Sequence, residues 1–326
     1  MKKVGVIVPS YNHAIYLDLR IQSILNQTYS NFELFILDDM STDDSKDVLL
    51  KYGGAERVKQ FVFNQENSGS VFRQWKKGIS LVAHCDYIWI AESDDFADTD
   101  FLFKMVQILE KDESLAMAYS NSYVVNDRSE KLNFTLSDHR NKTSGLELWS
   151  SDFSMKGIDF IKNVLSKNCW INNASAVVFR TNYIMNLGID IERYRYAGDW
   201  AVYLDILLKG NIYYLNECLS YYRDHDNNAS KKSNVNNVIV IEIYHIISRI
   251  FNSNLYTKSE LKSYLDSIRM HIVPYLLRDF RRMNFDSKFI QELKSIDKIL
   301  YKEMLFLIPK TFSTLAKNKI SRFLSL

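Results

Sequence analysis

An apolar, aromatic run that ends abruptly in carboxylates constrains the fold of this chain more than any other stretch. The run is YIWIAESDD, residues 87–95. Its length and its content of Tyr, Ile and Trp predict a strand buried on both faces, as in a parallel sheet. Glu92, Asp94 and Asp95 repel one another at such a strand end unless a cation lies between them, and Mg2+ or Mn2+ prefers oxygen ligands of this kind. A solvated acidic turn before a helix capped by Asp98 explains the same residues.

The same pattern, an apolar run closed by polar residues, recurs through the first part of the chain. Helical periodicity follows several of these runs, as in residues 15–25 and 71–79. A helix expected in STDDSKDVLLKYG is capped by Ser41 or Asp43. Strands that alternate with helices at this spacing predict βαβ units and an α/β fold with a mostly parallel, Rossmann-like sheet. The strands are expected at residues 4–8, 32–37, 58–64, 87–91 and 115–125.

Polar clusters follow the first, second and fourth predicted strands, so one sheet edge gathers candidate ligand-binding residues. The segment GVIVPSYN lacks the glycine loop of a dinucleotide-binding fold or a P-loop. Tyr11 can instead stack on a base, and the carboxylate of Asp38 or Asp39 can accept a hydrogen bond from a base imide. A half-buried tyrosine and two Asx-turns explain these residues equally well.

Charge and cysteine content exclude several classes of protein. A formal net charge of +2 does not indicate a nucleic-acid-binding protein. The three scattered cysteines favour a reducing compartment over a disulfide framework or a zinc site. Pro9 interrupts the N-terminal apolar run, which argues against a signal-peptide core. Glu242 interrupts VIVIEIYHII, the most apolar stretch, which argues against a membrane-spanning segment. We therefore expect a cytoplasmic protein, soluble or peripherally attached to the inner face of the plasma membrane.

Six stretches of the chain follow one another in a recognisable order. They are PSYNHAIYLDLRIQSILNQTYSNFELFILDDMSTDD (9–44), NSGS (67–70), YIWIAESDD (87–95), NNASAVVFR (172–180), GDW (198–200) and YYRDHDNNAS (221–230). Together they resemble the successive motifs of glycosyltransferase family 2, whose members are inverting enzymes with the GT-A fold. The similarity is greatest to bacterial members that build cell-surface polysaccharides.

The resemblance also implies a domain organisation. A GT-A domain would occupy residues 1–230, with a nucleotide-binding half at 1–125 and an acceptor half at 126–230. Helical periodicity after Asn234 predicts a helical C-terminal region at 231–326.

The resemblance assigns roles to individual residues of this chain. Asp199 matches the general base, and Asp94 with His225 matches the metal site. Met40 stands where a small residue, often Gly, is usual, and Glu92 replaces the usual Asp of a D-x-D motif. The residues matched to the nucleotide-sugar site are Pro9, Tyr11, Asn12, Asp39, Glu92 and Asp95.

Local alternatives remain for two of these assignments. Asp199 opens a helical pattern and is explained equally by an N-cap. His225 lies among charged residues, and the alternative is that it is an ordinary surface histidine with no ligand role.

The implied activity is that of a hexosyltransferase-type inverting glycosyltransferase. Its donor is a nucleotide sugar, with UDP as the expected nucleotide, and its acceptor is a hydroxyl of a glycan or lipid-linked oligosaccharide. Mn2+ or Mg2+ is the implied cofactor. The alternative is a non-catalytic nucleotide-sugar-binding scaffold of a polysaccharide assembly complex. A sugar nucleotidyltransferase would need a Gly-rich basic loop near the N-terminus, which is absent.

Two further regions allow alternative interpretations. Residues 126–170 begin without periodicity and predict a long loop. The segment 309–326 is basic and amphipathic, which suits an anionic membrane surface, packing on its own domain, or a homo-oligomer contact. Three tryptophans of the second half suit either stacking on sugar rings or core packing, namely Trp149, Trp170 and Trp200.

Overall fold

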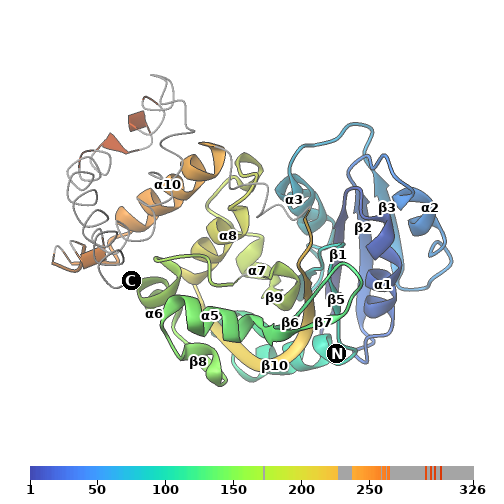
Figure 1. Ribbon diagram of the computed structural model, residues 1–326, viewed down its shortest axis with the longest axis horizontal. Coiled ribbons are helices and arrows are strands. Elements are labelled where there is room, and N and C mark those ends of the chain that lie inside the picture. The colour runs from blue at the N-terminus through green and yellow to red at the C-terminus, as the bar shows by residue number, and fades with distance from the viewer. Residues whose placement is uncertain are drawn as a thin grey trace, which may run out of the picture. The chain divides into compact units, whose positions relative to one another are not determined.

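The computed structural model describes residues 1–171, 173–226, 237–257, 259–261 and 263–264, with single positions at 291, 294, 295, 297, 298 and 302. They belong to two compact units, which Figure 1 shows in ribbon form. The first unit comprises residues 1–161 and 170–228, and the second comprises 162–169 and 229–326. The domain boundary expected after residue 230 stays a prediction.

Strands and helices alternate along the first half of the chain. The strands are β1 (Val4–Ser10), β2 (Phe32–Asp38), β3 (Val58–Phe63), β4 (Tyr87–Ile90), β5 (Phe96–Ala97), β6 (Leu115–Val125), β7 (Lys131–Thr135), β8 (Phe153–Met155), β9 (Val177–Arg180) and β10 (Asn211–Arg223). The helices are α1 (Ala14–Leu25), α2 (Ser45–Leu50), α3 (Val71–Leu81), α4 (Phe101–Lys111), α5 (Leu136–Ser144), α6 (Gly157–Phe160), α7 (Thr181–Ile184), α8 (Gly198–Leu207) and α10 (Asn237–Phe251). Short helical turns are η1 (Leu148–Ser150), η2 (Ile161–Leu165), η3 (Ala174–Ala176) and η4 (Ile191–Arg193).

One sheet runs through the first unit in the order β3-β2-β1-β4-β9-β6-β10-β5, with β7 beside β6 and β8 beside β10. The strands from β3 to β4 are parallel, as are β6 and β10. β9 lies antiparallel between β4 and β6. The predicted α/β class is confirmed, and the sheet is mixed, since β9 runs antiparallel to both of its neighbours.

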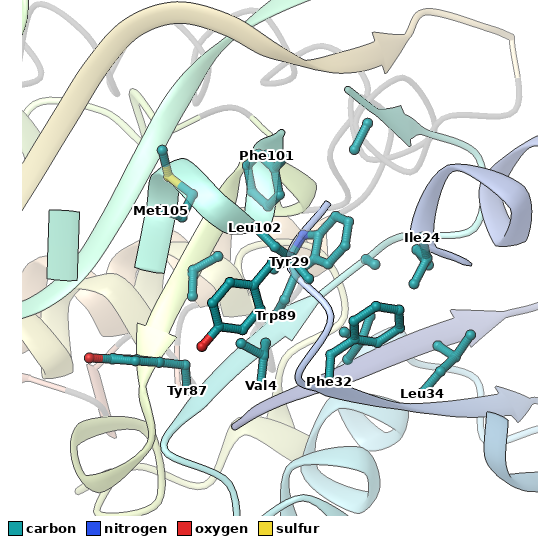
Figure 2. Packing of buried hydrophobic residues seen from close by; sticks show 14 of the residues in the cluster. Val4, Ile24, Tyr29, Phe32, Leu34, Tyr87, Trp89, Phe101, Leu102 and Met105 are labelled. Carbon is teal, nitrogen blue, oxygen red and sulfur yellow. The ribbon is translucent and has the colours of Figure 1, made fainter. Parts of the chain in front are cut away.

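The two faces of β1 explain why all of its residues are buried. Alternate side chains of a strand point to opposite faces. On one face Val4 joins a core formed with β2, β4, α1 and α4, in which the rings of Trp89 and Phe101 lie 4.7 Å apart (Figure 2). On the other face α3 comes so close that a Cβ on Gly78 would lie 2.4 Å from Cγ2 of Ile7. Helices thus cover both faces of the parallel strands.

The helix caps predicted at Ser41 or Asp43 and at Asp98 are wrong. The N-cap of α2 is Asp44 and that of α4 is Asp100. Asp43 and Asp98 instead accept a hydrogen bond from the backbone N–H two residues later, at 3.0 Å in each case. Both carboxylates therefore stabilise an Asx-turn that precedes the helix.

The long loop predicted from the polar first part of residues 126–170 is also wrong, because that part contains β7 and α5, and β8 and α6 follow it. Helix α5 begins with a capping box between Thr135 and Asp138. Further along, Trp149 donates a hydrogen bond from Nε1 to the hydroxyl of Tyr119 at 2.8 Å. Elements this short carry too few residues to show a period in the sequence.

The described part of the second unit contains α10 and the segment 162–169. Lys162 forms an ion pair with Glu260 at 3.1 Å, and the rings of Tyr256 and Tyr264 stack at 4.9 Å. The predicted helical pattern is present as α10, whereas the basic segment 309–326 lies outside the described residues. In the portion of the chain that the structure describes, no helix is both long enough and apolar enough to cross a bilayer.

Candidate active site

The carboxyl ends of β1, β2 and β4 meet at one edge of the sheet. The backbone N–H of Asp39 donates to the carbonyl of Ser10 at 2.8 Å, and that of Ala91 donates to Ile7 at the same distance. The segment that follows β1 therefore lies beside the residues after β2 and beside the acidic turn 92–95. The structure brings these three predicted strand ends together.

Three potential metal ligands converge at this edge, namely His13, Asp94 and His225. Their candidate ligand atoms all lie within 4.8 Å of one another. His225 is buried, and its Nε2 lies 3.0 Å from Oδ2 of Asp94. Burial acts to raise the pKa of Asp94, but the hydrogen bond from His225 and the charges of His13 and His225 outweigh it and hold that pKa below its usual value. The donor set of one carboxylate and two imidazoles fits a divalent cation.

Two buried arginines hold the backbone of the acidic turn. Arg20 on α1 donates from Nε to the carbonyl of Glu92 at 2.9 Å, and its guanidinium lies 5.1 Å from the ring centroid of Trp89. Arg223 donates from Nε to the carbonyl of Asp94 at 2.7 Å. Burial lowers the pKa of Arg20 to about 10, against the opposing charges of the nearby carboxylates. The two cations offset part of the negative charge that gathers here.

Glu92 is turned toward α3. Its Oε1 accepts a hydrogen bond of 2.7 Å from Nε1 of Trp75, and its backbone N–H donates to Oγ of Ser175 at 3.0 Å. Burial, together with the charge of Asp94, raises the pKa of Glu92 to about 8. Among the described residues, the group of atoms positioned to hold a metal around Asp94 does not include Glu92.

Asp95, the last residue of the acidic turn, is buried, and its Oδ1 accepts a hydrogen bond of 2.9 Å from the backbone N–H of Arg223. This contact ties the acidic turn to the end of β10. Burial, followed by the charge of Asp94, raises the pKa of Asp95 to about 7.

Asp39 is surrounded by protein donors. Its carboxylate accepts hydrogen bonds of 2.7 Å from Asn64, 2.8 Å from Gln74 and 2.9 Å from the backbone N–H of Ser68. Side chains of Ser68 and Asn67 add bonds of 2.7 and 3.3 Å. A carboxylate offers about four lone-pair sites, so the described contacts already occupy Asp39. It fixes the segment that enters α3.

The remaining residues matched to the nucleotide site lie around the end of β1. Tyr11 is 45% exposed, whereas Pro9 is buried within the strand. Asn12 accepts a hydrogen bond of 2.7 Å from the backbone N–H of Thr42 and has a φ of 55°. Met40 has a φ of 61°, in the left-handed region where glycine is least strained. A glycine would adopt this conformation with less strain than Met40 does.

Asp199 is the second residue of α8, so the N-cap explanation is wrong, since the N-cap is Ala197. Its Oδ1 accepts a hydrogen bond of 2.8 Å from the backbone N–H of Trp200. A Cβ on the preceding Gly198 would lie 2.6 Å from the ring of Phe72. The start of α8 therefore packs against the start of α3, the helix whose Trp75 reaches Glu92.

The structure corrects the sequence analysis in two places, the role of three tryptophans and the residues around the acidic turn. The tryptophans considered for sugar stacking are buried, with exposed fractions of 0% for Trp149 and 4% for both Trp170 and Trp200. Sequence reasoning missed the positions of His13 and Arg20. A cation on the buried face of an apolar helical pattern signals Arg20, while His13 within SYNH carries no comparable local signal.

Comparisons with known proteins match this architecture. A family model described as Glycosyl transferase family 2 matches residues 5–184. The putative teichuronic acid biosynthesis glycosyltransferase TuaG of Bacillus subtilis is 27% identical, over 70% of this chain and 81% of that protein. The Escherichia coli protein WfaP, a UDP-Glc:alpha-D-GlcNAc-diphosphoundecaprenol beta-1,3-glucosyltransferase, is 25% identical over 77% of this chain and 92% of its own length.

A solved structure has the same fold. S. aureus TarS 1-349 in complex with UDP-GlcNAc superposes with a TM-score of 0.64 and covers 97% of this chain and 92% of its own. Its sequence identity of 15% restricts that likeness to the fold.

Proposed function

The chain belongs to glycosyltransferase family 2, and from this membership we propose that it is an inverting, metal-dependent enzyme of bacterial surface polysaccharide synthesis. The proposal assigns it a UDP-linked sugar donor and a glycan or lipid-linked acceptor. The observation that carries this proposal is the distance of 3.0 Å between Nε2 of His225 and Oδ2 of Asp94. Both residues lie at the edge of the sheet where β1 ends. Family membership favours an enzyme over the non-catalytic scaffold.

The donor and acceptor classes are supported by the relatives. WfaP is named for transfer from UDP-Glc to a diphosphoundecaprenol-linked sugar, and TarS binds UDP-GlcNAc. TuaG is named for teichuronic acid biosynthesis. Two of these proteins are associated with a UDP sugar and one with a diphosphoundecaprenol-linked acceptor, so we assign the same classes to this chain.

Asp94 and His225 would hold the cation, Mn2+ or Mg2+. When bound, such an ion supplies Lewis-acid stabilisation of the charge that develops on the departing nucleoside diphosphate. The side chains of Arg20 and Arg223 donate to backbone carbonyls and keep the acidic turn in place, which fixes the direction of the Asp94 carboxylate. A rigid arrangement of this kind lowers the cost of reorganisation in the transition state.

The nucleotide is assigned to the end of β1 and the acidic turn. Tyr11, exposed at the strand end, stacks on the base, and the buried Pro9 and the neighbouring Asn12 shape the floor of that site. Asp39 holds the segment 64–70 in place beside the nucleotide site through its hydrogen bonds to Asn64 and Ser68. Glu92 is assigned to the ribose and Asp95 to the vicinity of the donor sugar.

Asp199 is assigned as the general base. In an inverting reaction the acceptor hydroxyl attacks the anomeric carbon from the face opposite the leaving group and passes its proton to a carboxylate oxygen. The amino end of α8 stabilises an ionised carboxylate at this position. The proton therefore moves from the acceptor hydroxyl to Asp199 while the nucleoside diphosphate departs.

The test is Asp199→Asn, which keeps the size of the side chain and removes its basicity. Turnover is expected to fall by about 100- to 10,000-fold, or about 3–5 kcal/mol of barrier. Stabilisation of the variant by UDP with Mn2+ in a thermal-shift assay is expected to match that of the wild type. Asp47→Asn is the matched control, because it also removes a carboxylate from the first turn of a helix. Wild-type turnover in Asp199→Asn would overturn the base assignment.

Two broader assignments complete the proposal. The GT-A domain would comprise residues 1–230, followed by a helical C-terminal region at 231–326. We place the enzyme in the cytoplasm at the inner face of the plasma membrane, where a lipid-linked acceptor is available.

A further inference from the structure

We propose that His13 is a third protein ligand of the cation, which gives the site two imidazoles and one carboxylate and makes it prefer Mn2+ to Mg2+. This inference rests on the metal site of the proposed function, formed by Asp94 and His225. It adds a residue from the start of α1 and predicts the identity of the ion. Neither follows from the two ligands already assigned.

The separations within the cluster suit one coordination sphere. Adjacent ligands about 2.1 Å from an octahedral ion lie about 3 Å apart, and opposite ligands about 4.2 Å apart. Nε2 of His225 and Oδ2 of Asp94 are 3.0 Å apart, and the candidate ligand atoms of all three residues lie within 4.8 Å of one another. Small side-chain rotations therefore suffice to bring the three donors onto one ion.

The helix itself does not explain a histidine at this position. His13 is the N-cap of α1, where Ser, Thr, Asp and Asn are strongly preferred, and its side chain makes no capping hydrogen bond. The backbone N–H of Ala14 is satisfied from outside the helix by Oδ2 of Asp43 at 3.0 Å. The chain thus places an imidazole at the helix start and directs it toward the acidic turn.

Neighbouring groups hold the His13 ring in position. Nδ1 lies 2.7 Å from Oγ of Ser93, which is itself buried in the acidic turn. The ring meets those of Tyr16 and His225 edge to face, with centroids 5.8 and 5.9 Å away. Hydrogen bonds of this kind orient metal-binding histidines and raise affinity for the ion. The imidazole is therefore held in place before a cation arrives.

The donor set determines which ion is preferred. Mg2+ selects oxygen ligands in a near-ideal octahedron and loses water reluctantly, whereas Mn2+, which also suits oxygen ligands, is a first-row transition ion and accepts imidazole better than Mg2+ does. Two histidines and one carboxylate leave the other coordination positions to water and to diphosphate oxygens. We therefore expect tighter binding of Mn2+ than of Mg2+, with His13 responsible for part of the difference.

The test compares Mn2+ binding to the wild type, His13→Ser and Asp94→Asn by electron paramagnetic resonance, with and without UDP. Serine is a good N-cap, so His13→Ser keeps α1 stable. We expect the variant to bind Mn2+ at least about tenfold more weakly, with a smaller preference over Mg2+. The nitrogen couplings of bound Mn2+ should fall from two imidazoles to one. His139→Ser, an exposed histidine of α5, should change neither readout.

The outcomes separate this inference from the proposed function. Unchanged Mn2+ affinity and nitrogen coupling in His13→Ser, with binding lost in Asp94→Asn, would overturn the role of His13 alone. Wild-type Mn2+ binding in Asp94→Asn, or no Mn2+ binding by the wild type, would overturn the metal site itself. Weaker binding of Mn2+ and Mg2+ to the same degree in His13→Ser would refute the selectivity.

Discussion

Two buried tryptophans donate hydrogen bonds of similar length to different partners. Nε1 of Trp75 donates to Glu92 at 2.7 Å, and Nε1 of Trp149 donates to the hydroxyl of Tyr119 at 2.8 Å. The first bond positions a carboxylate of the candidate site, and the second lies in the core. Their comparison separates effects on activity from effects on stability.

We expect Trp75→Phe and Trp149→Phe each to lower the free energy of unfolding by about 1–3 kcal/mol, because each leaves a buried acceptor without its donor. Only Trp75→Phe should also reduce turnover per folded molecule, since Glu92 loses the contact that orients it. Urea denaturation measures the first effect and a donor-consumption assay the second. Equal losses of turnover in both variants would contradict a role for the Glu92 contact.

Glu33 provides a prediction of pH dependence away from the candidate site. Its carboxylate lies 2.9 Å from Nζ of Lys3 and 2.7 Å from Nε2 of His84. Burial acts to raise the pKa of Glu33, but the hydrogen bonds from His84 and Lys3 outweigh it, so the pKa lies below its usual value of 4.5. A lowered pKa in the folded state stabilises the protein above the unfolded value.

Glu33→Gln should therefore lower the melting temperature by a few degrees near neutral pH, and the difference should disappear in acid, as the pH falls from 4.5 through the lowered pKa of Glu33. Thermal denaturation of both proteins across this range measures the effect. Glu113→Gln, at an exposed glutamate, is the control and should follow the wild type. A difference that persists unchanged in acid would show that charge is not its cause.

Among the secondary-structure elements, α6 shows how closely backbones approach in this fold. A Cβ on Gly157 would lie 2.1 Å from the carbonyl oxygens of both Leu207 and Gly210. Both obstacles are backbone atoms, which cannot rotate away. In the turn after α2, by contrast, a Cβ on Gly54 would meet no atom within 4 Å.

We expect Gly157→Ala to lower the free energy of unfolding by at least about 1–3 kcal/mol, because α6 must move away from the end of α8. Gly54→Ala should be neutral or stabilise by up to about 1 kcal/mol, since it restricts only the unfolded chain. Chemical denaturation of both variants measures the difference. A Gly157→Ala protein as stable as the wild type would contradict the close approach.

The elements differ in how far the sequence predicts them. The first four parallel strands were predictable because each is a continuous apolar run closed by polar residues. The elements between residues 126 and 170 were not, because contacts distant in sequence stabilise them. Ser137 at the start of α5, for example, donates its backbone N–H to Oδ1 of Asn121 at 3.0 Å. Sequence periodicity does not record such contacts.

At the scale of the whole molecule, the segment 309–326 carries the remaining prediction. Its basic, amphipathic sequence suits an anionic membrane surface, where each basic residue contributes about 1 kcal/mol. Deleting it should reduce sedimentation of the protein with phosphatidylglycerol vesicles and leave sedimentation with neutral vesicles unchanged. Equal binding of the full chain and the truncated chain to anionic vesicles would refute membrane attachment through this segment.

The sequence by itself determined the α/β class, the parallel strands and the edge where Tyr11 and the acidic turn 92–95 meet. These features follow from local signals, namely strand length, strand-end polarity and the direction of parallel strands. Only the tertiary structure decided that Glu92 faces Trp75, that Arg20 supports the turn, and that His13 lies beside Asp94 and His225. The direction of a side chain depends on how helices pack on the sheet, and spacing along the chain does not encode it.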